Sequence, residues 1–85
     1  MKFRLLVDLE VFEFIKTLRR TEQSLLYRRF RQIQESPTAF TDYHEYAQAG
    51  HRIEINICDR FAISFAVDHL DRHIKVLEVV SADRK

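Results

Sequence analysis

The second half of the sequence contains three consecutive runs in which apolar and polar residues alternate. They are Arg52–Ile57 (RIEINI), Phe61–Asp68 (FAISFAVD) and His73–Val80 (HIKVLEVV). Alternation with a period of two is typical of β-strands that are buried on one face only. Just three or four residues separate the runs, and such short connections join antiparallel neighbours. The pattern predicts a three-stranded meander with one covered face and one open face.

The first half predicts one short strand followed by two amphipathic helices. Lys2–Val7 is strand-like, and Asp8 is a candidate N-cap for the first helix. The second helix is expected to begin at a Thr21 N-cap and to end near Ser36, because Pro37 disfavours helical backbone in the residue before it. The apolar stripes of the helices consist of Leu9, Phe12, Ile15 and Leu18 in the first, widened by Val11 and Phe14, and Leu26, Phe30 and Ile33 in the second.

Together these segments predict a single α+β domain spanning residues 1–85. The expected order is β-α-α-β-β-β, with a helical hairpin packed on one face of a small, mainly antiparallel, curved sheet. Residues Thr38–Gly50 have no clean period and are expected to form a packed loop or an irregular strand, with a turn at Gly50.

Bulk composition excludes several classes of protein. Cys58 is the single cysteine, so an intrachain disulfide and a cysteine-based zinc cluster are impossible. No apolar stretch approaches the roughly 20 residues that cross a bilayer, and nothing resembles a secretory signal. The four histidines lie in predicted loops and at strand starts, so no helix presents a metal-binding histidine pair. We therefore expect a soluble cytoplasmic protein without membrane contact, cofactor or metal.

The strand pattern also predicts which side chains reach the open face. If the isoleucines of the first run face the helices, Arg52 and Glu54 project outward together with Ser64 of the second run. Small residues in that second run, Ala62, Ser64 and Ala66, would line a shallow trough. The third run changes phase between Val76 and Leu77, which indicates either a bulge or burial on both sides.

The order of these segments, with Glu35–Pro37 (ESP) closing the second helix, resembles the RelE/ParE superfamily of bacterial type II toxins. The runs GHRIEINI, FAISFAVD and IKVLEVVSADR are similar to that family's sheet and, with the helices, cover most of the chain. The resemblance implies a toxin component of a toxin–antitoxin system, of the kind linked to translation inhibition or plasmid stabilisation. In RelE-like toxins the open sheet face enters the ribosomal A site and cleaves mRNA.

Carried over by position, the resemblance assigns Arg52 to a basic position of the first meander strand and Arg84 to the arginine near the end of the last. Two other positions depart from the pattern. Glu54 occupies a second basic position, and Ala62 replaces a middle-strand arginine, with Arg60 displaced into the turn. The ParE branch keeps the fold, lacks a nuclease site and inhibits DNA gyrase.

A metal-independent cut of RNA needs a base, a cation for the developing phosphorane charge and an acid. Glu54 could be the base, Arg52 and Arg84 the charge stabilisers, and His73 the acid. The simpler alternative is that Glu54 and Lys75 form a cross-strand ion pair on a solvated face. Candidate nucleic-acid contacts are Arg60, Ser64, Lys75, Arg28 and Arg29; the last two are equally expected on the solvated side of an amphipathic helix.

The sequence leaves three functions open. The first is a ribosome-dependent mRNA endonuclease, and the second is a non-catalytic gyrase inhibitor or a detoxified antitoxin-bound subunit. The third is an interaction domain unrelated to toxins. Both toxin-like functions imply an antitoxin partner. The apolar second phase of the last run, Leu77 and Val79, is a candidate docking edge or homodimer surface.

Overall fold

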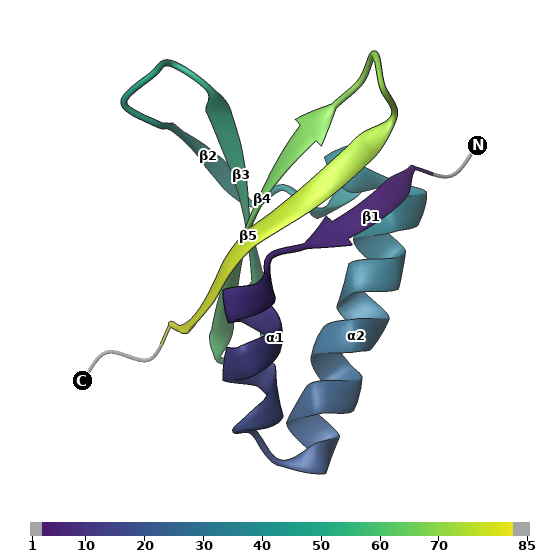
Figure 1. The fold of residues 1–85 in the computed structure, drawn as a ribbon, viewed down its shortest axis with the longest axis vertical. Coiled ribbons are helices and arrows are strands. Elements are labelled where there is room, and N and C mark those ends of the chain that lie inside the picture. The colour runs from purple at the N-terminus through teal and green to yellow at the C-terminus, as the bar shows by residue number, and fades with distance from the viewer. Residues whose placement is uncertain (1–2, 83–85) are drawn as a thin grey trace.

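The computed structural model describes residues 3–82 and shows two helices packed against one face of a five-stranded sheet (Figure 1). In chain order the elements are β1 (Arg4–Val7), α1 (Leu9–Lys16), α2 (Arg20–Glu35), a 3₁₀ turn η1 (Pro37–Phe40), β2 (Tyr43–Tyr46), β3 (Arg52–Cys58), β4 (Phe61–Asp68) and β5 (His73–Ser81). The predicted α+β class and the helical hairpin are confirmed. Neither described helix has the length and hydrophobicity of a membrane span.

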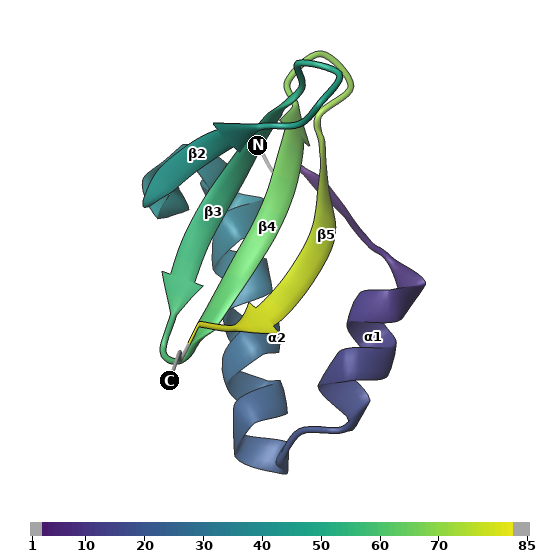
Figure 2. The same cartoon turned by 90° about the vertical axis from the view of Figure 1, so that its left-hand side faces the viewer.

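The sheet has the strand order β1-β5-β4-β3-β2. Strands β2 to β5 form antiparallel pairs, and β1 lies parallel to β5 at the other edge. The predicted meander therefore corresponds to β3, β4 and β5. The structure adds β2, which forms from the segment without a clean period, and all four of its residues are exposed. Figure 2 shows the open face in front and α2 behind it.

Helix α1 buries part of the predicted stripe, and Phe14 and Leu18 also pack against the core. Val11 and Ile15 are its buried residues, whereas Leu9 is 71% exposed and Phe12 is 40% exposed. Asp8 is the N-cap as predicted, but its side chain makes no capping hydrogen bond. The backbone carbonyl of Asp8 instead accepts from the N–H groups of Val11 and Phe12.

Helix α2 begins earlier than predicted, because Arg19 and not Thr21 occupies the N-cap. Glu22 closes a capping box there by accepting a hydrogen bond from the backbone N–H of Arg19 at 3.3 Å. The predicted core stripe of Leu26, Phe30 and Ile33 is confirmed, and the helix ends at Glu35 before the Ser36 C-cap.

The covered face of the sheet contributes the centre of the core. Phe61, Ile63 and Phe65 of β4 are fully buried beneath the helices, as are Ile74 and Val76 of β5. The pairing of β4 with β5 shifts register between Ser64 and Phe65. This shift confirms the predicted irregularity in the last strand as a bulge, and it returns Val79 to the core.

Strand β3 has the opposite orientation to the predicted one. Cys58 pairs with Phe61 and Asn56 pairs with Ile63, and residues paired in an antiparallel ladder share a face. Glu54, Asn56 and Cys58 therefore lie on the covered side, while Ile55 and Ile57 lie on the open side with Ser64 and Ala62. The prediction that Arg52 and Glu54 project outward with Ser64 is wrong.

Candidate functional site

The open face of the sheet is mainly apolar at its centre. Ala62, Ser64 and Ala66 of β4 form the predicted row of small residues, and each is half-buried. Ile55, only 5% exposed, lies between Tyr43 and Ser64 on the neighbouring strands. We call the partly exposed apolar residues of this surface the open-face patch: Leu6, Tyr43, Ile57 and Val80, each between 41% and 50% exposed.

Charged groups interrupt this surface, because Lys75 lies between Leu6 and Ala66 and Glu78 lies beside Ser64. Lys75 and Glu78 on β5 and Glu45 on β2 project on the open side, as their ladder partners require. Lys75 pairs with Asp8 at 3.5 Å, so the expected Glu54–Lys75 ion pair is wrong. An RNA backbone is held by a row of cations, and the centre of this face offers isoleucine and alanine instead.

Arg52 and Glu54 meet on the covered side of β3. The Arg52 Nε donates to Glu54 Oε2 at 2.7 Å, and this hydrogen bond raises the pKa of Arg52. The pair lines a pocket of about 420 Å³ beyond the end of the helical cover. The other lining residues are Pro37, Thr38, Thr41, Val67 and His69.

The four predicted catalytic residues are not assembled in one place. His73 pairs with Asp68 across the ladder and lies on the open face, whereas Arg52 and Glu54 lie on the other side of the sheet. Arg84 falls outside the described residues. Among residues 3–82 the predicted base and the predicted acid therefore face opposite ways.

Arg29 is held in a polar network between α2 and β3. Its guanidinium donates to Asn56 Oδ1 at 2.8 Å and to Gln32 Oε1 at 2.9 Å, and it lies 5.0 Å from the Phe40 ring centre. Asn56 in turn donates to Asp42 Oδ2 at 3.1 Å. These contacts bind Arg29 to the fold. Its neighbour Arg28 is exposed, as expected for the solvated side of the helix.

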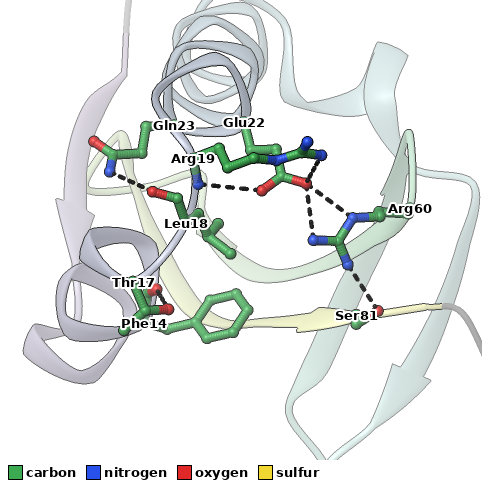
Figure 3. A network of polar contacts seen from close by, with 8 residues as sticks. All are labelled: Phe14, Thr17, Leu18, Arg19, Glu22, Gln23, Arg60 and Ser81. Atoms are coloured by element: carbon green, nitrogen blue, oxygen red, sulfur yellow. Dashed lines mark hydrogen bonds and ion pairs between the residues drawn. The ribbon is translucent and has the colours of Figure 1, made fainter.

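Arg60 is likewise engaged within the protein (Figure 3). Its guanidinium lies 2.8 Å from Glu22 Oε2 and 4.6 Å from the Phe61 ring centre, and it also donates to Ser81 Oγ at 3.4 Å. The hydrogen bond from Arg60, followed by those from Arg19, holds the pKa of the Glu22 carboxyl below its ordinary value. Because all three guanidinium nitrogens already contact Glu22 or Ser81, Arg60 is a weak candidate for nucleic-acid contact.

A second concavity, of about 270 Å³, opens between α1 and the C-terminal part of β5. Val11 and Phe14 form its helical wall, and Leu77, Val79 and Val80 form its strand wall. Val80 also belongs to the open-face patch, so the two apolar surfaces meet there. The alternation in the last run predicted Leu77 and Val79 as part of a docking surface. No sequence pattern predicted Phe14 or Tyr43 as part of that surface. Cys58 is buried, and burial raises the pKa of its thiol, which disfavours the nucleophilic thiolate.

Comparison with solved structures identifies the arrangement. A chain of the archaeal RelE–RelB complex from Pyrococcus horikoshii OT3 superposes with a TM-score of 0.84 at 15% identity, and the match covers 100% of both chains. The chain has the RelE toxin fold. The E. coli toxin RelE, solved free as a double arginine-to-alanine mutant, gives a TM-score of 0.66 at 17% identity, covering 98% of this chain and 86% of that one. The sequence matches no protein-family model and no curated protein.

The resemblance predicted from the order of the segments is thus confirmed as a likeness of fold. The RelE fold sets the sheet and the two helices in place, but it does not by itself supply a chemistry. In this chain the open face of the RelE fold carries the open-face patch, and its charged pair Arg52–Glu54 lies on the covered side.

Proposed function

We propose that this chain is the toxin-fold subunit of a toxin–antitoxin pair and acts by binding protein, without cutting RNA. The observation that carries the proposal is the orientation of β3. Its isoleucines, and not Arg52 and Glu54, face the open side beside Ala62 and Ser64.

A surface that combines exposed apolar and aromatic residues with a few charges of both signs suits a protein partner better than a nucleic acid. The core of protein interfaces is depleted in charge and rich in apolar and aromatic groups, which matches Tyr43, Ile57 and Val80. The similar archaeal structure is a complex of RelE with RelB. By analogy, the partner of this chain is an antitoxin that covers the open-face patch and the adjoining concavity between α1 and β5.

Among residues 3–82, the side chains of this face give no support for phosphodiester cleavage. Transition-state stabilisation needs donors aimed at the developing charge, and the cationic candidates Arg29 and Arg60 are tied into internal hydrogen bonds. The released subunit would therefore act on a protein target such as DNA gyrase, or have no toxicity of its own.

The decisive experiment has three arms. First, the chain is co-expressed with the product of the adjacent open reading frame, and we expect a stable complex. Second, the chain is added alone to translating ribosomes, and we expect the message to stay intact. Third, gyrase supercoiling is measured, which separates a gyrase inhibitor from a detoxified subunit.

Cuts at the ribosomal A site would overturn the non-catalytic proposal. Glu54→Gln and Arg52→Ala are the variants that would then assign the nuclease to the Arg52–Glu54 pocket. If the proposal is correct, both variants bind the antitoxin as the wild type does, because their side chains lie on the opposite side of β3 from Ile57.

A further inference from the structure

The hairpin turn between β4 and β5 gathers three side chains that can bind a metal ion. They are Asp68, Asp71 and His73, and one ligand atom from each lies within 4.8 Å of the other two. The cluster is distant in sequence from Arg52 and Glu54, and it plays no part in the protein-binding surface proposed above.

Strand pairing builds the first two members of the cluster. Asp68 ends β4 and His73 begins β5, and the two residues are direct partners in the antiparallel ladder. Directly opposed residues have Cβ atoms about 4.5–5.5 Å apart. The carboxylate and the imidazole therefore project side by side from the same face.

The turn places the third residue of the cluster, Asp71, beside the first two. Asp68 Oδ1 accepts a hydrogen bond from the backbone N–H of Asp71 at 2.9 Å, and Arg72 takes a left-handed backbone conformation with φ of 55° before β5 starts. This closed turn places Asp71 Oδ2 3.8 Å from His73 Nδ1.

That distance is too long for a hydrogen bond. His73 Nδ1 is nonetheless buried, and it is the one buried side-chain nitrogen or oxygen of residues 3–82 that has no hydrogen-bond partner. A buried polar atom without a partner costs free energy. Between two ligand atoms, metal bonds of about 2.0–2.2 Å span about 3–4 Å, so a cation would satisfy Nδ1 and Asp71 together.

We propose that the β4–β5 turn binds a divalent first-row transition-metal ion through Asp68, Asp71 and His73 Nδ1. One imidazole with two carboxylates is a ligand set that suits zinc, manganese, iron or cobalt. Asp71 is 71% exposed, so solvent completes the coordination. Asp68, Asp71 and His73 lie at strand ends and in a turn, so a search for metal ligands on one helix face does not find them.

The test is direct titration of the purified chain with Zn²⁺, and with Co²⁺ as a spectroscopic probe. We expect one ion per chain, visible absorption bands from bound Co²⁺, and a higher Tm in the presence of Zn²⁺. Asp71→Asn and His73→Gln are expected to weaken binding at least about tenfold, by analogy with the 10- to 100-fold losses caused by removing a metal site's supporting groups.

Two control variants test whether Zn²⁺ binding depends on this cluster. His69→Gln removes a histidine of the same turn that lies outside the cluster and contacts Phe3, and Asp59→Asn changes the turn between β3 and β4. Both should bind Zn²⁺ as the wild type does. Absence of saturable binding, or equal affinity in Asp71→Asn and the wild type, would overturn the proposal; so would loss of binding in His69→Gln. Circular dichroism of every variant excludes unfolding as the cause.

Discussion

The Arg60 guanidinium lies 2.8 Å from the Glu22 carboxylate, although 38 positions separate the two residues in the chain. The contact ties the N-terminal turn of α2 to the turn between β3 and β4 (Figure 3). Glu22 is buried, so its charge depends on this partner and on Arg19. Helix and sheet are thereby joined at the end opposite to the Arg52–Glu54 pocket.

Acid should therefore destabilise the wild type partly through Glu22. The pKa of this carboxyl is lowered in the folded protein, so its stabilisation is fully present above the ordinary glutamate pKa of about 4.3. It is lost as the pH falls through the lower pKa of the folded state. In Glu22→Gln, the drop in Tm between pH 6 and pH 3 should be smaller than in the wild type. An identical pH profile in the two proteins would contradict the role of Glu22.

Replacing Arg60 tests the same contact at neutral pH. Arg60→Ala leaves the buried Glu22 with Arg19 as its remaining ion-pair partner, so we expect a clear loss of Tm. Arg28→Ala removes an exposed arginine from the same helix as Glu22 and should change stability by less than about 0.5 kcal/mol. Equal Tm values for the two variants would show that the Arg60 contact contributes nothing.

Replacing Asn56 should destabilise the fold strongly, although its side chain is small. It is 3% exposed and links Arg29 of α2 to Asp42 before β2. Asn56→Ala leaves these groups short of a partner, and we expect a loss of about 1–3 kcal/mol in the free energy of unfolding. Urea denaturation measures this loss, and Gln48→Ala, at an exposed position in the β2–β3 turn, is the control. A loss no larger than that of the control would mean that water replaces Asn56 without penalty.

Shortening a buried side chain in the central strand β4 should leave this small domain close to unfolding. Phe65 is fully buried in the middle of β4, and Phe65→Ala is expected to cost about 3–5 kcal/mol. Small domains are only marginally stable, so a large unfolded fraction is expected by circular dichroism. Phe12→Ala, at a residue 40% exposed on α1, should cost far less.

A charge on the open face should abolish antitoxin binding without unfolding the chain. Ile57→Glu places a carboxylate in the open-face patch at a side chain that is already 41% exposed. We expect the complex to be lost in co-purification while the Tm changes little. Leu70→Glu is the matched control, because Leu70 is 98% exposed in the β4–β5 turn, away from the patch. Retention of the complex by Ile57→Glu would place the partner elsewhere.

The class of the fold follows from the sequence because its strong signals are local. Period-two runs, the stripe of Leu26, Phe30 and Ile33, and Pro37 after α2 each determine a segment without long-range information. Strand β2 was predicted only as a packed loop or an irregular strand, because its YHEY residues are all exposed and its pairing with β3 leaves no hydrophobic pattern.

The orientation of β3 was predicted wrongly because the turn after it is one residue shorter than expected. Three turn residues were expected, Cys58 to Arg60, which would place Ile57 opposite Phe61. The observed turn has two residues, so Cys58 pairs with Phe61 and every side chain of β3 changes face. Polar Asn56 tolerates the covered side because Arg29 and Asp42 supply its hydrogen bonds. These partners lie 27 and 14 positions away in the sequence, so a local sequence pattern cannot predict them.

The parallel pairing of β1 with β5 has a consequence for synthesis of the protein. Strand β1 (Arg4–Val7) is made before every other described element, but its neighbour in the sheet is β5, which is made after all of them. Non-local contacts of this kind form slowly, since loop closure must come first. A nascent chain therefore cannot complete its sheet, or present a finished open face, until β5 has been made, whatever the helices have already formed.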